Sequence, residues 1–465
     1  MARDVKPERV EHDSMGELRV PSDALWGAQT QRAIENFPVS GAPLPKEFLY
    51  ALARIKAASA RANRSLGFLD SARTDAIVSA VDEILSGHHD HQFPIDVFQT
   101  GSGTSTNMNM NEVVAHLASS RLGQPVHPND HVNMSQSSND VIPSTIHLAA
   151  LIVWRDALDP ALNHLVEIIE SRSRELETVV KTGRTHLMDA MPLTFGQELS
   201  GWAAQIKHDR ERLADAAGRL CRLALGGTAV GTGINAPPGF AEAAILELSQ
   251  DTELALVCAP NRFAAMASQD DAVEFSGGLK TLAVSLMKIG NDLRWMNSGP
   301  LTGLSEIVLK PLQPGSSIMP GKVNPVIPEA TVMVAAQVIG NDVTITLAGQ
   351  SGNFELNVML PLIARNLLES LTLLSNVCRL LADRAIADFV VRTERLRQAL
   401  DLNPILVTAL NPVIGYEKAA AIAKEAYQSG RPVFEVAREQ SGLSDAELKT
   451  LLNPFDLTRG GNRSG

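Results

Sequence analysis

From about residue 140 to residue 390, apolar side chains recur at three- and four-residue steps over long stretches of the chain. Ile142, Ile146, Ala149 and Val153 illustrate this spacing, which places apolar side chains on one face of an α-helix. The alternation that is typical of half-buried strands is scarce. We predict five helices, each up to ~50 Å long at about 1.5 Å per residue. They cover residues 141–178, 193–223, 262–296, 324–349 and 357–390.

Shorter elements flank these helices. Helical spacing also covers residues 47–65 and roughly 72–86. After residue 390, proline and glycine separate short helices, of which Tyr416–Ser429 is the clearest amphipathic example. The pattern therefore predicts an all-α protein with three domains. These are an N-terminal domain (1–140), a central helical bundle (141–390) and a small C-terminal helical domain (391–465).

The long helices carry small residues on more than one face, for example Ala335, Ala336 and Gly340. Helices this long cannot cover all their apolar faces within a small monomer. We therefore expect the bundle to pack against copies of itself. The alternative is a monomeric bundle whose remaining faces are covered by the flanking domains.

The charge balance argues against a nucleic-acid partner. The 465 residues include 41 Lys and Arg against 52 Asp and Glu, a net charge of −11, whereas proteins that bind nucleic acids carry basic patches. A field of this sign repels a dianionic ligand, so a site for such a ligand must be locally positive.

Three features predict a cytoplasmic location and no membrane partner. No apolar run approaches the ~20 residues of a membrane-spanning helix. The first residues are charged and include no apolar signal core. Cys221, Cys258 and Cys378 are widely spaced and odd in number, so we expect free thiols rather than disulfides or a zinc site.

Four polar clusters interrupt the apolar pattern and hold the candidate chemistry. The first, residues 99–112, places glycines and five hydroxyls at an expected helix start, with Ser102, Thr104 and Thr106 as candidate caps. Capping alone would use one hydroxyl, so we favour a site for a carboxylate.

The second cluster, residues 133–140, contains Ser137, Ser138 and Asn139 at the head of the first long helix. These neutral donors suit a ligand, and a capping box that ends in Asp140 is the alternative.

The third cluster, residues 183–189, lies just ahead of the second long helix, which we expect to begin near Pro192. Thr185 and His186 lie beside an Arg, and a histidine in such surroundings is a candidate acid or base. A purely structural histidine is the alternative.

The fourth cluster is the loop 315–325, with the sequence GSSIMPGKVNP. Its glycines let backbone N–H groups approach a ligand, and its prolines fix the path of the chain. The loop adds two hydroxyls, a cation and an amide, which together favour an anion site. They belong to Ser316, Ser317, Lys322 and Asn324. Glu329 follows early in the next helix, where it would otherwise only complement the helix dipole.

No metal or cofactor motif accompanies these clusters. The histidine patch at residues 88–91 lacks further ligands at helical spacing. The glycine-rich run 226–233 follows a helix rather than a strand, so it indicates a tight turn and not a dinucleotide site. We predict no cofactor and no metal.

The loop GSSIMPGKVNP resembles the common loop of the fumarase/aspartase superfamily. Along nearly the whole chain, further segments resemble class II fumarases in the same order. They include QTGSGTSTNMNMNEV, HPNDHVNMSQSSND, GRTHLMDAMP, GGTAVGTG and SGNFELNVMLP. The resemblance implies an all-α fold in three domains and a homotetramer with a core of twenty helices, five from each subunit. It also implies active sites that each draw on three subunits.

By the same resemblance, the chain is a hydro-lyase of the tricarboxylic acid cycle. Such an enzyme hydrates fumarate reversibly to L-malate through an aci-carboxylate intermediate, without a cofactor. Ser316 would be the catalytic base and His186 would belong to the acid side, hydrogen-bonded toward Glu329; a water held by the latter two is the alternative base. The substrate would be held by Ser102, Thr104, Ser137, Ser138, Asn139, Thr185, Lys322 and Asn324.

His127, Asn129 and Asp130 match a second, non-catalytic dicarboxylate site of the family, although Gln124 stands where the family has a basic residue. Aspartate ammonia-lyase is the closest alternative activity. Aspartases usually carry Ser-Thr where this chain has Ser-Ser at 137–138, which is the fumarase form. A non-catalytic helical scaffold is a further alternative.

Overall fold

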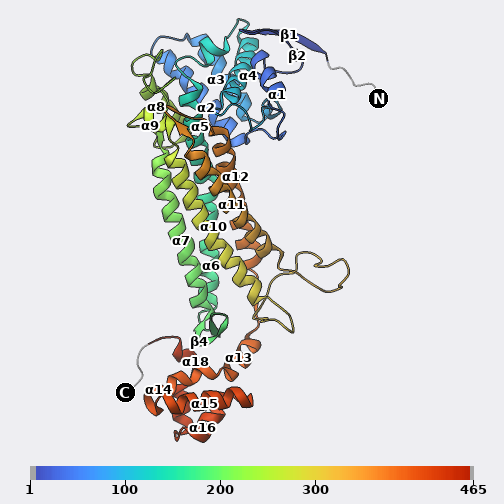
Figure 1. Cartoon of the computed structure of the whole chain (residues 1–465), viewed down its shortest axis with the longest axis vertical. Helices are drawn as coiled ribbons and strands as arrows, with labels where there is room; N and C mark the ends of the chain where they lie inside the picture. The colour runs from blue at the N-terminus through green and yellow to red at the C-terminus, as the bar shows by residue number, and fades with distance from the viewer. Residues whose placement is uncertain (1–6, 461–465) are drawn as a thin grey trace. The chain divides into compact units, whose positions relative to one another are not determined.

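The structure, a computed structural model, describes residues 7–460, and helices make up most of it (Figure 1). Part of the charged N-terminal segment considered above lies outside the described residues. The chain forms two compact units: unit 1 is Met1–Pro160, Arg210–Ala283 and Ala336–Ser375, and unit 2 is Ala161–Asp209, Val284–Ala335 and Asn376–Gly465. The division falls inside several long helices, so the three domains 1–140, 141–390 and 391–465 stay a prediction.

Unit 1 is organised around α2 (Lys46–Ser65), which packs against α3 (Ser71–Leu85), α5 (Ser138–Val153) and α8 (Phe240–Thr252). Its many alanines let these helices approach closely, and Phe48 is fully buried among them. The remaining elements of unit 1 are β1 (Glu8–Asp13), β2 (Gly16–Pro21), α1 (Ala28–Asn36), η1 (Asp90–Gln92), α4 (Thr104–Leu122), η2 (Pro128–Val132), η3 (Trp154–Leu158), β5 (Arg222–Leu223), β6 (Val257–Cys258), α9 (Arg262–Ala267), β8 (Gly352–Asn353) and β9 (Leu356–Asn357).

Unit 2 contains an antiparallel hairpin of β3 (Val180–Thr185) and β4 (Met188–Thr194) and a small C-terminal group of helices. That group packs around Leu410, Ile422 and Val436, all fully buried. The other elements of unit 2 are β7 (Ile307–Val308), η4 (Ala382–Ile386), β10 (Val390–Val391), α13 (Thr393–Leu402), η5 (Pro404–Leu410), α14 (Asn411–Ile414), α15 (Tyr416–Ser429), α16 (Val433–Gln440), α17 (Asp445–Leu451) and α18 (Pro454–Leu457).

The predicted long helices are present with small shifts at their ends. They are α5 and α6 (Asp159–Glu175), α7 (Phe195–Leu220), α10 (Asp270–Met296), α11 (Val326–Gly349) and α12 (Leu360–Leu381). The prediction of one helix over 262–296 is wrong, because Ser268 is extended and separates α9 from α10. The second long helix starts at Phe195 rather than near Pro192, because residues 188–194 pair as β4.

Two helical stretches have the length and composition of a membrane span, which corrects the expectation that no apolar run approaches that length. They are Ser138–Glu175 and Val326–Gly349. In the first, 78% of the most apolar window is buried, as in the core of a globular protein; in the second, only 33% is buried. Met333, Val343 and Leu347 of α11 are more than half exposed.

Candidate active site

The loop between α10 and α11 folds back on itself around Ser316. The N–H of Gly315 donates to the carbonyl of Lys322 over 2.9 Å, and the side-chain amide of Asn324 donates to the carbonyl of Gly315 over 2.7 Å. A Cβ at position 315 would lie 2.3 Å from the Lys322 oxygen, so only glycine permits this closure.

The Ser316 side chain lies inside this turn. Its Oγ accepts the backbone N–H groups of Ile318 at 3.3 Å and of Met319 at 3.0 Å. Two donors aimed at one hydroxyl oxygen stabilise negative charge on that oxygen. Ser316 also lines a shallow cavity of about 410 Å³ within the loop, together with Lys322.

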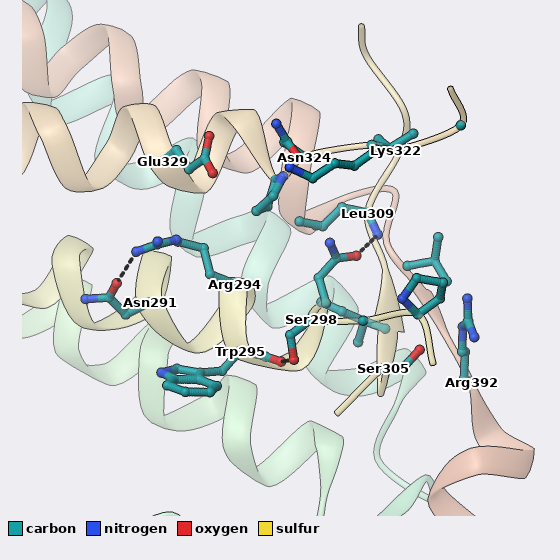
Figure 2. Close-up of a pocket in the computed structure, with 18 residues that line it drawn as sticks. Asn291, Arg294, Trp295, Ser298, Ser305, Leu309, Lys322, Asn324, Glu329 and Arg392 are labelled. Atoms are coloured by element: carbon teal, nitrogen blue, oxygen red, sulfur yellow. Dashed lines mark hydrogen bonds between the residues drawn. The ribbon is translucent and has the colours of Figure 1, made fainter. Parts of the chain in front are cut away.

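A larger cavity of about 560 Å³ also has Lys322 in its lining (Figure 2). Its wall is formed by the end of α10, the segment 305–309, residues 321–325 of the loop and the first turn of α11. Lys322, Asn324 and Glu329, three residues predicted from separate parts of the fourth cluster, therefore line one cavity.

The charges around this cavity are mainly positive. Arg294, Lys322 and Arg392 line it, and Glu329 is its one acidic residue. Arg294 donates to the Asn291 side chain over 2.9 Å, whereas the side chains of Lys322 and Arg392 have no polar partner within residues 7–460. A site with unpaired cations suits an anion despite the net charge of −11. Sequence reasoning missed Arg294 and Arg392, because both lie outside the polar clusters.

His186 lies at the tip of the β3–β4 hairpin and not in a loop at a helix start. His186 and Leu187 form its two-residue turn, with φ values of 56° and 61°, and Thr185 pairs with Met188. Two residues with positive φ match the twist of the flanking strands. Thr185 and His186 are exposed, and the residues that line the two cavities include neither.

The first cluster begins α4 in unit 1, but the predicted capping by Ser102, Thr104 or Thr106 is wrong. Gly103, with φ 72°, precedes the helix and has no side chain to cap it, and the Gln99 side chain instead accepts the N–H of Thr106 over 2.9 Å. The hydroxyls of Ser102 and Thr104 instead bond each other over 2.7 Å. The two hydroxyl groups therefore lie near the start of α4, and neither accepts a backbone N–H of the helix.

The second cluster forms the capping box that was the alternative reading. Ser137 and Asp140 cap each other at the start of α5. The Asp140 carboxylate also accepts the N–H groups of Gly226 (2.8 Å) and Thr228 (3.0 Å), so it binds the backbone of the glycine-rich run. Burial raises the pKa of Asp140, although these donors oppose the shift. Ser138 and Asn139 of this helix start are not used as caps.

The residues matched to a second dicarboxylate site lie on the surface of unit 1. His127 Nδ1 accepts the N–H groups of Asn129 (3.2 Å) and Asp130 (3.1 Å), and so caps the short helical turn η2. All three side chains are exposed. Within the described part of the chain, no group of three or more His, Cys, Asp or Glu side chains is placed to hold a metal ion.

Comparison with known proteins gives consistent matches along the chain. The family described as Lyase matches residues 16–340, and the family described as Fumarase C C-terminus matches residues 406–459. A fumarate hydratase class II of Xylella fastidiosa is 60% identical over 97% of this chain and 96% of its own length. One from Pseudomonas aeruginosa, fumarate hydratase class II 2, is 61% identical over 97% of this chain and 99% of its own. The crystal structure of class II fumarase from Schistosoma mansoni superposes with a TM-score of 0.95 and 39% identity, over 98% of this chain and 100% of that one.

Proposed function

This chain belongs to the class II fumarate hydratase family, and we propose that it catalyses the reversible hydration of fumarate to L-malate with residues of its four polar clusters. The observation that carries the assignment of residues is the loop 315–325. There one hydroxyl oxygen accepts two backbone N–H groups, next to a cavity lined by an unpaired lysine, an amide and a carboxylate.

In the direction of fumarate, a base removes the C3 proton of malate and the electron pair delocalises into the adjacent carboxylate. Ser316 is the proposed base, because the N–H groups of Ile318 and Met319 lower the cost of charge on its oxygen. Lys322 and Asn324 stabilise the resulting aci-carboxylate. The C2–O bond then breaks, and His186, oriented by Glu329, protonates the departing hydroxide to form water.

We propose that the site draws on more than one copy of the chain. The hairpin with His186 lines neither cavity of its own unit, and Ser102, Thr104 and Ser137–Asn139 belong to unit 1. A homotetramer that buries the exposed apolar side chains of α11 would bring these groups together at subunit boundaries. His127, Asn129 and Asp130 remain a candidate for a second dicarboxylate site.

The same reasoning supports a cytoplasmic enzyme whose partners are its substrate and its own copies. Cys221, Cys258 and Cys378 are free thiols, as a reducing compartment favours. The acidic net charge gives no support for nucleic-acid binding. We propose that neither a cofactor nor a metal takes part.

The test is the ultraviolet absorbance of the fumarate double bond. Purified chain mixed with L-malate should produce a steady rise in absorbance, and fumarate should lose absorbance until the same ratio is reached. Aspartate in place of malate should produce no rise. A rise with aspartate alone would indicate an ammonia-lyase, and no change with either compound would indicate a scaffold without activity.

A further inference from the structure

Lys56 lies in the middle of α2 with no exposed surface, which is rare for a lysine. Its ammonium nitrogen donates to Oδ1 of Asn107 (2.6 Å), Oδ1 of Asn133 (3.0 Å) and Oε1 of Gln136 (3.0 Å). An ammonium group has three N–H donors, so this set is complete. All three acceptors are neutral, so the charge of Lys56 has no counter-ion in contact.

The partners are held with their oxygens toward Lys56. The amide nitrogen of Gln136 donates to the carbonyls of Val132 (3.0 Å) and Met134 (3.1 Å), and that of Asn107 donates to Ser138 Oγ (3.2 Å). A neutral amine has only two N–H donors, so its lone pair would face one of the three oxygens, and among the described residues only Asn133 Oδ1 has another donor, the amide of Asn107 at 3.2 Å. The arrangement therefore favours the charged form.

Asn107 connects Lys56 to the candidate substrate residues. Asn107 lies on α4 one turn after Thr104, and its amide bonds Ser138 at the start of α5. Asn133 and Gln136 precede that helix start directly. One ammonium group thus joins the first and second polar clusters, which are about thirty residues apart in the sequence.

We propose that Lys56 is a positioning residue of the dicarboxylate site, whose buried ammonium group fixes Ser138 against α4 and keeps this site positive for a dianion. The inference rests on the function proposed above. Burial lowers the pKa of Lys56 to about 7, while the charge of Asp140 acts in the opposite direction. A dianion bound nearby favours the protonated amine, so substrate and charge stabilise each other.

The experiment compares Lys56→Met with Lys46→Met, which removes one exposed charge from the first turn of the same helix. Steady-state kinetics with malate should give a KM raised about tenfold or more in Lys56→Met, with a smaller loss of kcat. Succinate, a dicarboxylate that does not react, should inhibit this variant about tenfold more weakly than wild type. Lys46→Met should match wild type within about twofold.

Asn133→Asp provides a second test. It keeps an oxygen next to the Lys56 ammonium group, but its carboxylate neutralises the positive charge of that group. This variant should also raise KM, and it carries the test if Lys56→Met does not fold. Wild-type KM and succinate inhibition in either folded variant would overturn the inference. Wild type without activity on malate would instead refute the proposed function, so the two failures are distinct.

Discussion

The hydroxyl oxygen of Ser316 accepts two backbone N–H groups, whereas its neighbour Ser317 is exposed and has no hydrogen bond in the described part of the chain. The two serines have the same side chain and differ only in where the loop directs it. They therefore provide a matched pair for testing the role of a base.

We expect Ser316→Ala to lower kcat at least tenfold, because about 1.4 kcal/mol or more of barrier stabilisation disappears with the oxygen. Ser317→Ala should retain wild-type kcat. The measurement is the initial rate with saturating malate, with circular dichroism to show that both variants are folded. If Ser316→Ala keeps more than about a tenth of the rate, the base is another group, such as a bound water.

Asp96 gives a prediction about acid stability. Its carboxylate accepts the N–H groups of Ser40 (2.6 Å), Gly41 (2.7 Å) and Phe98 (2.8 Å). Burial raises the pKa of Asp96, but these donors outweigh it and the pKa lies below the usual 3.8. The folded state therefore prefers the ionised form, and this stabilisation is lost as pH falls below about 4.

Asp96→Asn should accordingly unfold at a lower temperature than wild type at pH 6, and this difference should shrink at pH 3.5. Asp75→Asn, at an exposed surface pair with Arg64, should show little difference at either pH. Scanning calorimetry at the two pH values measures both. A difference for Asp96→Asn that is the same at both pH values would contradict the assignment.

At the scale of elements, the β3–β4 hairpin that carries His186 is anchored by buried charges. Lys181 is paired with Glu198 (2.8 Å) and Glu306 (2.7 Å), and Arg184 is paired with Glu306 (2.8 Å). Glu306 lies just before the strand β7 that lines the larger cavity. The hairpin and the cavity wall are therefore held together within unit 2.

Glu306→Gln should destabilise the protein by about 2 kcal/mol or more, because it leaves the Lys181 ammonium with one carboxylate in a buried setting. Glu198 is less buried, so Glu198→Gln should cost less. The temperature of thermal unfolding and kcat should both fall more in Glu306→Gln than in Glu198→Gln. Equal effects from the two variants would show that Glu306 does not act as the central anchor.

The sequence predicted most helices, because a period of three to four residues persists wherever a helix buries one face. It did not predict that His186 lies on a hairpin, since β3 and β4 are short and do not alternate. Nor did it predict that the Asp140 carboxylate accepts hydrogen bonds from the backbone of the glycine-rich run, because these partners are about ninety residues apart. The candidate residues came from polar clusters and family likeness, whereas Lys56 and Arg392 required the folded chain.

At the scale of the whole molecule, the proposed site combines His186 of one chain with Ser316 of another. This arrangement predicts complementation between two inactive variants. When Ser316→Ala and His186→Asn chains are co-expressed with different affinity tags, random assembly should give about one site in four with both residues intact.

Oligomers purified through both tags should therefore regain a substantial part of the malate activity, whereas each variant alone should have almost none. A site within one chain predicts the opposite, since every chain in the mixture carries a defect. Two-tag oligomers without recovered activity would refute the shared site.

The exposed apolar face of α11, with Met333, Val343 and Leu347, has a consequence for biosynthesis. A newly translated chain exposes this apolar face to solvent until it associates with another copy of the chain. Association of two chains is bimolecular, so its rate varies with the square of the concentration of unassembled chains. The rate of capture by a chaperone varies only with the first power of that concentration. Slow expression should thus favour chaperone-bound chains over finished oligomers, and clustered translation on one messenger RNA should favour assembly.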